Sequence, residues 1–146
     1  MDIPRNTHIL VMDGGTMLLF ENSGDALYPD LNIVEHREQD SAATRDQGSA
    51  QPGTNHESVG ARRSSYEQTD FHQRDEDQFA ADAADMLKRE VLAGHINKLI
   101  IIAAPRTLGE LRKHFHGEVE KRVIGEISKD LAGHPTDEIV AAIANI

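Results

Sequence analysis

The sequence predicts an α/β domain with a mixed five-stranded sheet, flanking helices and a long loop after the third strand. Three observations support this prediction. Two β-type runs flank a Gly-Gly pair, a helical pattern follows a long polar segment, and a nearly continuous apolar run follows that helix. A chain of 146 residues has the length of one ordinary domain, so we expect a single domain over residues 1–146.

The first two strands are expected to form a hairpin. THILVMD and MLLFEN are separated by Gly14 and Gly15, and Asp-Gly-Gly suits a tight turn because glycine adopts positive φ at no steric cost. These strands are therefore expected to be antiparallel neighbours. LNIVEHRE, residues 31–38, alternates in polarity and predicts a third strand near an edge of the sheet.

A polar segment follows the third strand. Residues 41–68 are rich in Ser, Ala, Gly, Asn and Gln, and they lack the apolar spacing of a packed element. We therefore expect a flexible loop over about 41–68. A loop of this length in a compact domain is either functional or disordered.

Helix and strand alternate in the second half of the chain. A helix that ends before Gly94 carries five apolar residues on one face, namely Phe79, Ala83, Met86, Leu87 and Val91. KLIIIAA, residues 98–104, reads as a central strand covered on both faces.

Three further elements complete the prediction. Thr107 and Glu110 fit a capping box, which predicts a helix start at Thr107 with Leu108 and Leu111 facing inward. KRVIGEIS, residues 121–128, predicts the fifth strand, and Thr136 is expected to cap a last short helix. Three strands followed by helix, strand, helix, strand and helix is the element order of an RNase H-like domain.

Composition limits the classes of function. The chain has no cysteine, which excludes disulfides, thiolate zinc sites and cysteine nucleophiles. The N-terminal apolar run is too short for a signal-peptide core, and no stretch approaches the ~20 apolar residues of a membrane span. We therefore expect a cytoplasmic protein without membrane insertion.

Basic residues are unevenly distributed. The net charge is −10, which argues against general nucleic-acid binding, yet residues 41–66 hold three arginines against two acids. The apolar strand at 98–104 also ends beside a helix start, where backbone donors favour anions. The candidate anion- or RNA-binding residues are Arg45, Arg62, Arg63, Arg106, Arg112 and Lys113.

Two carboxylates are candidate metal ligands. Asp13 closes the first strand, where RNase H-like nucleases carry a metal-binding aspartate, and Glu21 lies on the neighbouring strand. Mg²⁺ prefers oxygen ligands, so Asp13 is also the candidate catalytic residue. The alternative, which we favour, is that Asp13 only starts the hairpin turn through its side-chain oxygen. We expect no cofactor.

Several segments resemble the bacterial host attachment protein family, also called protein required for attachment to host cells. These segments are HILVMDGGTMLLFEN, DQFAADAADML, KLIIIAAPRTLGELRKHFHGEV and ISKDLAGHPTDEI. That family is similar to the middle domain of archaeo-eukaryotic peptide release factors. In those factors a loop with a Gly-Gly-Gln tip precedes a long helix and enters the peptidyl-transferase centre. Here the corresponding stretch reads ESVGARRSSYEQ, with Gly60-Ala61-Arg62 at the tip position and no Gly-Gly-Gln.

The resemblance implies a factor that binds the ribosome, tRNA or another RNA. Because no tip glutamine is available to position water, peptidyl-tRNA hydrolysis is not expected, and a non-enzymatic role is favoured. Two alternatives remain open. One is a cytoplasmic interaction factor that supports surface attachment indirectly, as the family name implies, and the other is a metal-dependent RNase H-like nuclease that uses Asp13.

Overall fold

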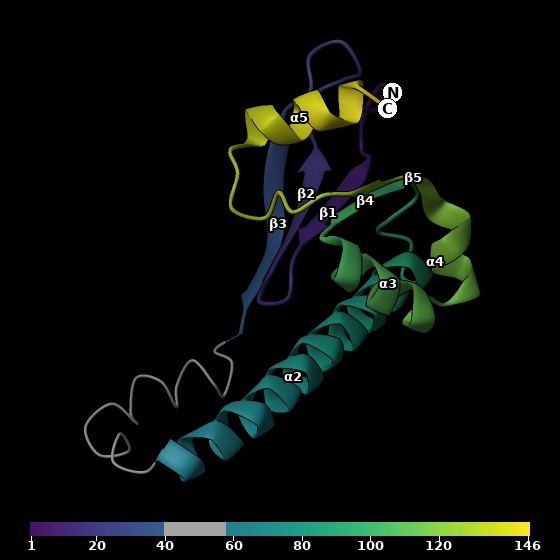
Figure 1. The fold of residues 1–146 in the computed structure, drawn as a ribbon. Helices are drawn as coiled ribbons and strands as arrows, with labels where there is room; N and C mark the ends of the chain where they lie inside the picture. The colour runs from purple at the N-terminus through teal and green to yellow at the C-terminus, as the bar shows by residue number, and fades with distance from the viewer. Residues whose placement is uncertain (40–57) are drawn as a thin grey trace.

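The computed structural model describes the backbone of residues 1–39 and 58–146, and side chains over 1–39 and 72–146. Its centre is a mixed five-stranded sheet in the order β3-β2-β1-β4-β5 (Figure 1). The strands are β1 (His8–Met12), β2 (Thr16–Asn22), β3 (Leu31–Glu38), β4 (Leu99–Ala103) and β5 (Val123–Ser128). Antiparallel pairing joins β1 to β2 and β2 to β3, whereas β4 pairs in parallel with β1 and β5. The predicted hairpin and the predicted edge position of the third strand are thus confirmed.

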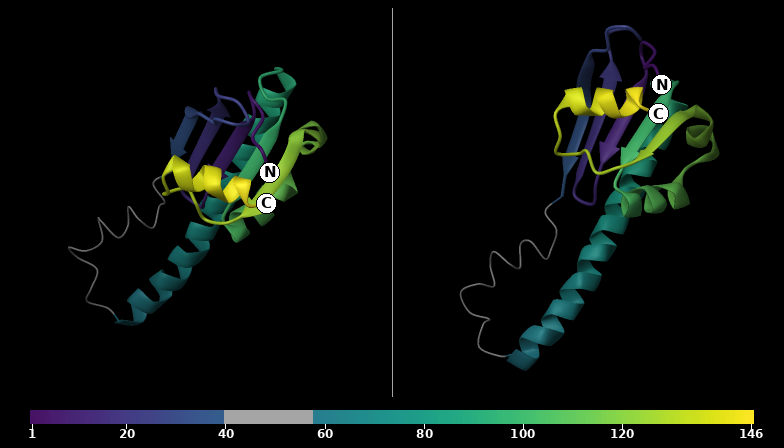
Figure 2. Two further views of the ribbon diagram at one scale, coloured as in Figure 1. Left: turned by 90° about the horizontal axis from the view of Figure 1, so that it is seen from above. Right: turned by 45° about the horizontal axis from the view of Figure 1, so that its top comes forward.

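Helices cover both faces of the sheet. The helices α2 (Ser58–Leu92), α3 (Pro105–His114) and α4 (Gly117–Arg122) lie on one face, and α5 (Thr136–Ala144) lies on the other (Figures 1 and 2). In the part of the chain that the structure describes, no helix is long and apolar enough to cross a membrane.

The alternation of β1 divides the core into two layers. Leu10 and Met12 face the α2 side, and Ile9 and Val11 face the α5 side. Strand β4 is buried throughout, as predicted for a central strand, and β1 is equally buried. The predicted apolar face of α2 is also buried, and its members are Phe79, Ala83, Met86, Leu87 and Val91.

The C-terminal part of α2 packs against the sheet. Between residues 72 and 92, the buried side chains begin at Phe79. The N-terminal half of the helix extends beyond the end of the sheet (Figures 1 and 2). With 35 residues and a rise of about 1.5 Å each, α2 is about 52 Å long.

This helix corrects the predicted loop at 41–68. Residues 40–57 lie outside the described part of the chain, but Ser58 begins α2, so positions 58–68 are helical. Gly60, Ala61 and Arg62 therefore belong to the helix and do not form a loop tip. The prediction was wrong here because a helical segment that does not pack on the core needs no apolar stripe.

The predicted starts of two helices are also wrong. Helix α3 begins at Pro105 after Ala104, whose side chain accepts no hydrogen bond, so Thr107 lies within the first turn and forms no capping box. Proline at the first helical position is itself a start signal, because its missing N–H needs no partner there. Helix α5 likewise has Pro135 at its N-cap, and Thr136 is its first residue.

The fifth strand begins two residues later than predicted. Lys121 and Arg122 end α4, a six-residue helix whose N-cap is His116. The His116 Nδ1 atom accepts a hydrogen bond of 3.0 Å from the Glu118 backbone N–H. A helix of less than two turns shows no periodicity in the sequence, which explains why α4 was missed.

Candidate functional site

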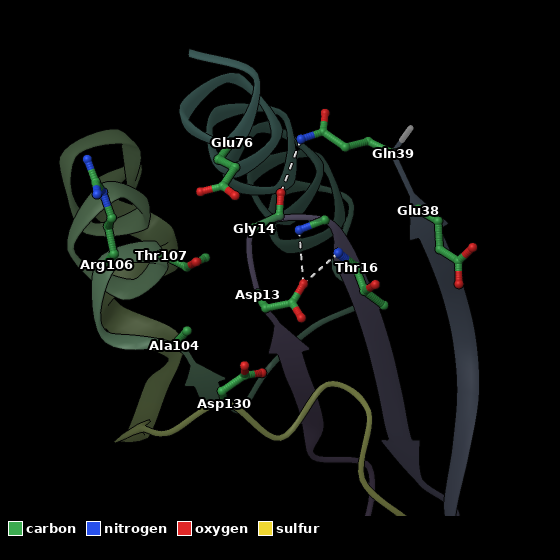
Figure 3. Close-up of a pocket in the computed structure, with 11 residues that line it drawn as sticks. Asp13, Gly14, Thr16, Glu38, Gln39, Glu76, Ala104, Arg106, Thr107 and Asp130 are labelled. Atoms are coloured by element: carbon green, nitrogen blue, oxygen red, sulfur yellow. Dashed lines mark hydrogen bonds between the residues drawn. The ribbon is translucent and has the colours of Figure 1, made fainter. Parts of the chain in front are cut away.

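A pocket of about 630 Å³ lies where β1 and β4 end (Figure 3). Parallel strands that pair side by side bring their carboxyl ends to one edge, and open α/β sheets bind ligands in crevices at that edge. The hairpin turn and the strand-to-helix junction, which are far apart in the sequence, therefore meet here. The lining residues are Asp13, Gly14, Gly15, Thr16, Glu38, Gln39, Glu76, Ala104, Arg106, Thr107 and Asp130.

Asp13 shapes the turn between β1 and β2. Its Oδ1 atom accepts hydrogen bonds from the backbone N–H groups of Gly15 at 2.9 Å and Thr16 at 2.8 Å. The backbone N–H of Asp13 donates to the Thr16 carbonyl at 3.0 Å. These are the hydrogen bonds of the turn that the sequence favoured for this residue.

The tip of this turn is packed against two other elements. Gln39 donates from Nε2 to the Gly14 carbonyl at 3.1 Å and from its backbone N–H to the Gly15 carbonyl at 2.9 Å. A Cβ atom on Gly14 would lie 2.5 Å from Cδ of Glu76 on α2. Neither glycine has a positive φ, which among the described glycines occurs at Gly94. The conformational reason expected from the sequence therefore does not apply to Gly14, and a Cβ there would require the flexible end of the Glu76 side chain to move.

The pocket is predominantly acidic. Four carboxylates line it, from Asp13, Glu38, Glu76 and Asp130, and Arg106 is the basic residue of its lining. Arg106 is exposed at the start of α3, and its side chain points away from Asp13 and Asp130 (Figure 3). The charge inside the pocket therefore opposes the phosphate site that the helix start alone suggested.

Two further candidate bases lie at the other end of α3. Arg112 is paired with Glu126 of β5, and Lys113 donates a hydrogen bond of 3.0 Å to Glu110. This hydrogen bond, together with the charge of Lys113, holds the pKa of the Glu110 carboxyl below its usual range. Six residues of helix, a rise of about 9 Å, separate Arg112 from Arg106. The structure thus places Arg112 and Lys113 outside the pocket.

The remaining candidate bases come before and within α2. Arg45 lies outside the described residues, whereas Arg62 and Arg63 belong to the first turns of α2, in a part whose side chains are not described. These turns belong to the half of the helix that extends beyond the sheet (Figure 1).

Glu21 does not approach Asp13. It is paired in register with His8 at the start of β1, whereas Asp13 follows the end of that strand. Over the described ranges 1–39 and 72–146, no three or more His, Asp or Glu side chains are arranged to hold a metal ion. The two candidate metal ligands therefore lie at opposite ends of the sheet.

Sequence reasoning missed several residues of the pocket. Asp130 follows β5 by two positions, and the parallel pairing of β4 with β5 could have placed it at the same edge. Glu76 gave no such signal, because it precedes the apolar face of α2 that begins at Phe79. Glu38 and Gln39 end an edge strand whose register the sequence left open.

The model of bacterial archaeo-eukaryotic release factor family 12 matches residues 6–143, which include every described strand and most of the chain. The chain belongs to this family. The match confirms the predicted relationship to release factors, but the description of this family does not mention host attachment. No curated protein matches the chain. Membership of family 12 thus relates the chain to factors that act in translation.

Proposed function

We propose that this family 12 protein is a ribosome-associated translation factor that binds RNA and does not hydrolyse peptidyl-tRNA. The observation that carries the proposal is the projecting half of α2 in a chain of the release factor family. In release factors, the loop that precedes a long helix enters the peptidyl-transferase centre, and in this chain the residues that correspond to the loop tip, Gly60 to Arg62, lie in the first turns of α2. The proposal places the protein in the cytoplasm, where ribosomes are.

The anchoring of α2 suits this role. Buried residues from Phe79 to Val91 fix its C-terminal part to the sheet, and the backbone of the other half extends beyond the sheet (Figure 1). Arg62 and Arg63 occupy its first turns, and adjacent arginines are typical contacts to RNA phosphates. We assign RNA contact to these two residues, with Arg45 before the helix as a further contact.

The pocket at the ends of β1 and β4 is a less suitable RNA site. Its four carboxylates repel phosphate, so within this region we retain only the outward-pointing Arg106 as an RNA contact. Arg112 and Lys113 already pair with carboxylates, which reduces the charge they offer to a phosphate. The proposed RNA surface therefore centres on the projecting half of α2.

Co-sedimentation with purified ribosomes tests the proposal. Replacement of Arg62 and Arg63 by alanine is expected to weaken association and to flatten its salt dependence, because a protein that neutralises fewer phosphates releases fewer counterions on binding. The matched control replaces Lys88 and Arg89, two exposed bases near the other end of α2, by alanine. Equal weakening in both double variants, or no salt-dependent association of the unchanged protein, would contradict the proposal.

A release assay tests the absence of hydrolysis. Ribosomes that carry labelled peptidyl-tRNA are mixed with the protein, and we expect no release above the rate without it, because the chain has no Gly-Gly-Gln. Release at a rate that depends on protein concentration would refute this part of the proposal and leave ribosome association intact.

The two alternatives make different predictions. A role in surface attachment rests on the resemblance to host attachment proteins, and a pull-down from its own cells that captures envelope proteins without ribosomal components would favour it. A nuclease requires carboxylates that converge, whereas Asp13 is held by its turn and Glu21 lies at the far end of β1. Magnesium-dependent RNA cleavage that disappears in Asp13→Asn would favour the nuclease.

A further inference from the structure

A second pocket, of about 360 Å³, lies at the opposite end of β1 from the first. It is formed on the α2 side of the sheet by the first residue of β1, by β2 and β3, and by the end of α2 with the turn that follows. His8 and Glu21 form one wall, Glu90 and His95 form another, and Leu19 and Val34 contribute apolar surface. No function assigned above uses this pocket.

His8 is a buried side chain whose polar atoms are incompletely paired. Its side chain is 9% exposed, and its Nδ1 atom is buried and, among the described residues, has no hydrogen-bond partner. Its Nε2 atom lies 3.9 Å from Oε2 of Glu21, which is too far for a hydrogen bond. Burial lowers the pKa of His8, although Glu21 and the nearby backbone of Asn6 partly oppose this effect, so the ring is neutral and one of its nitrogens carries a lone pair. Buried polar atoms of this kind are rare unless a partner is supplied.

A β-bulge turns additional side chains into the pocket. The register passes from Leu19 opposite Glu35 to Phe20 opposite Ile33, so Val34 is the extra residue of β3. Adjacent residues of a regular strand point to opposite faces, yet Val34 and Glu35 both line this pocket. Bulges commonly redirect side chains in this way beside binding sites.

The carboxylates of the pocket differ in what they already bind. Glu35 is paired with Arg37 at 2.8 Å, and Glu90 lies 2.7 Å from Nδ1 of His95. Glu21, by contrast, makes no side-chain hydrogen bond within the described part of the chain, and the neutral imidazole of His8 lies 3.9 Å from it. The unused groups of the pocket are thus a carboxylate and a neutral imidazole, both acceptors.

We propose that this pocket binds a protonated primary amine with a short aliphatic stem, either a free alkylamine or the end of a lysine side chain. The ammonium group has three donors and no acceptor, which complements Oε2 of Glu21 and Nε2 of His8, two acceptor atoms that lie 3.9 Å apart. The stem lies against Leu19 and Val34. A metal ion suits the pocket less well, because it requires ligands that converge to about 2.0–2.2 Å, and these side chains are spread over separate walls.

Nuclear magnetic resonance titration of the labelled full chain tests this site. At about pH 8, where histidine side chains are neutral, n-butylammonium is expected to give saturable shifts of the His8 ring and of backbone amides around the pocket. The uncharged n-butanol, which has the same stem, is expected to give none. A blocked Gly-Lys-Gly peptide then distinguishes the sources: binding of the peptide indicates a lysine side chain, and binding of n-butylammonium alone indicates a free amine.

Two matched variants locate the binding. Glu21→Gln removes the unpaired carboxylate and is expected to weaken n-butylammonium binding by about tenfold or more, because a charged hydrogen bond is removed. Glu120→Gln makes the same change at an exposed position of α4 and is expected to leave binding unchanged. Equal affinity in the two variants overturns the proposal.

Two further results would overturn the proposal in the unchanged protein. One is an equal response to n-butanol and n-butylammonium. The other is saturation by Zn²⁺ with shifts of the His8 and His95 rings and no saturable response to n-butylammonium, which would assign a metal site. These comparisons use the unchanged chain, so they decide the question even if Glu21→Gln fails to fold.

Discussion

Asn22 joins the N-terminal segment to the loop between β2 and β3, and its replacement by alanine is expected to destabilise the protein strongly. The residue is fully buried at the end of β2. Its Nδ2 atom donates to the Ile3 carbonyl at 2.9 Å, and its Oδ1 atom accepts from the backbone N–H groups of Gly24 at 3.0 Å and Asp30 at 2.8 Å. Asn22→Ala removes these three short hydrogen bonds, and with them two longer ones from Nδ2 to the carbonyls of Pro4 at 3.3 Å and Asp25 at 3.4 Å.

The magnitude follows from these three hydrogen bonds. Each contributes about 1 kcal/mol net, so their removal lowers the free energy of unfolding by about 3 kcal/mol. Water that enters at the partly exposed loop offsets some of this decrease, and the expected range is about 2–4 kcal/mol. For a chain of this length, the melting temperature falls by about 4 °C per kcal/mol, so we expect a decrease of roughly 8–16 °C.

Thermal and urea unfolding followed by circular dichroism measure the change. Asn32→Ala is the matched control, because Asn32 is exposed and its side chain donates to Ser23 Oγ at 3.0 Å on the surface. It is expected to cost no more than about 0.5 kcal/mol. If Asn22→Ala destabilises the protein no more than Asn32→Ala does, the assignment of Asn22 as a buried connection is wrong.

Three further predictions concern the two pockets. Asp13→Asn keeps the Oδ1 acceptor of the turn and is expected to change the free energy of unfolding by less than about 1 kcal/mol. Asp13→Ala removes two hydrogen bonds and is expected to lower the free energy of unfolding by about 1–2 kcal/mol. Equal urea midpoints for the two variants would contradict this. Leu108→Ala, at a buried position, is expected to lower the free energy of unfolding by about 2–5 kcal/mol, and Arg106→Ala, at an exposed position, by less than about 1 kcal/mol. The reverse order would indicate a structural role for Arg106. Because burial lowers the pKa of His8 in the folded state, the unfolded chain binds more protons as the pH falls below about 6.5, so the contribution of His8 to stability decreases there. Urea unfolding at several pH values is expected to show a weaker acid destabilisation in His8→Gln, and an unchanged slope would contradict the assignment.

The features predicted correctly are those encoded by neighbouring residues. The hairpin at Asp13, the apolar face of α2 and the all-apolar strand β4 each depend on spacing within a few residues, and each is found in the structure. The reason offered for Gly14 was wrong, because its φ is not positive, and the atoms nearest to it come from Glu76, which is remote in the sequence. The prediction of a capping box at Thr107 was also wrong, because α3 begins two residues earlier, at Pro105.

The candidate site was only partly accessible to sequence reasoning. Asp13 and Arg106 could be placed at strand ends, and the parallel pairing of β1 and β4 brings them to one pocket. Glu76 and Asp130 reach it through tertiary packing and supply most of its negative charge, together with Glu38. A local prediction of an anion site at a helix start takes no account of charges that other elements contribute.

The pairing of β1 with β4 has a consequence for biosynthesis. His8 lies opposite Leu99, so the two central strands are separated by most of the chain, whereas β1, β2 and β3 follow one another closely. At a synthesis rate of about 5–20 residues per second, β1 leaves the ribosome roughly 5–20 seconds before the strand that completes it. During this interval one side of a strand with four consecutive apolar residues has no partner, which is the state in which nascent chains aggregate. Holding chaperones that bind short apolar segments are therefore expected to contact residues 8–12 of the nascent chain until β4 emerges.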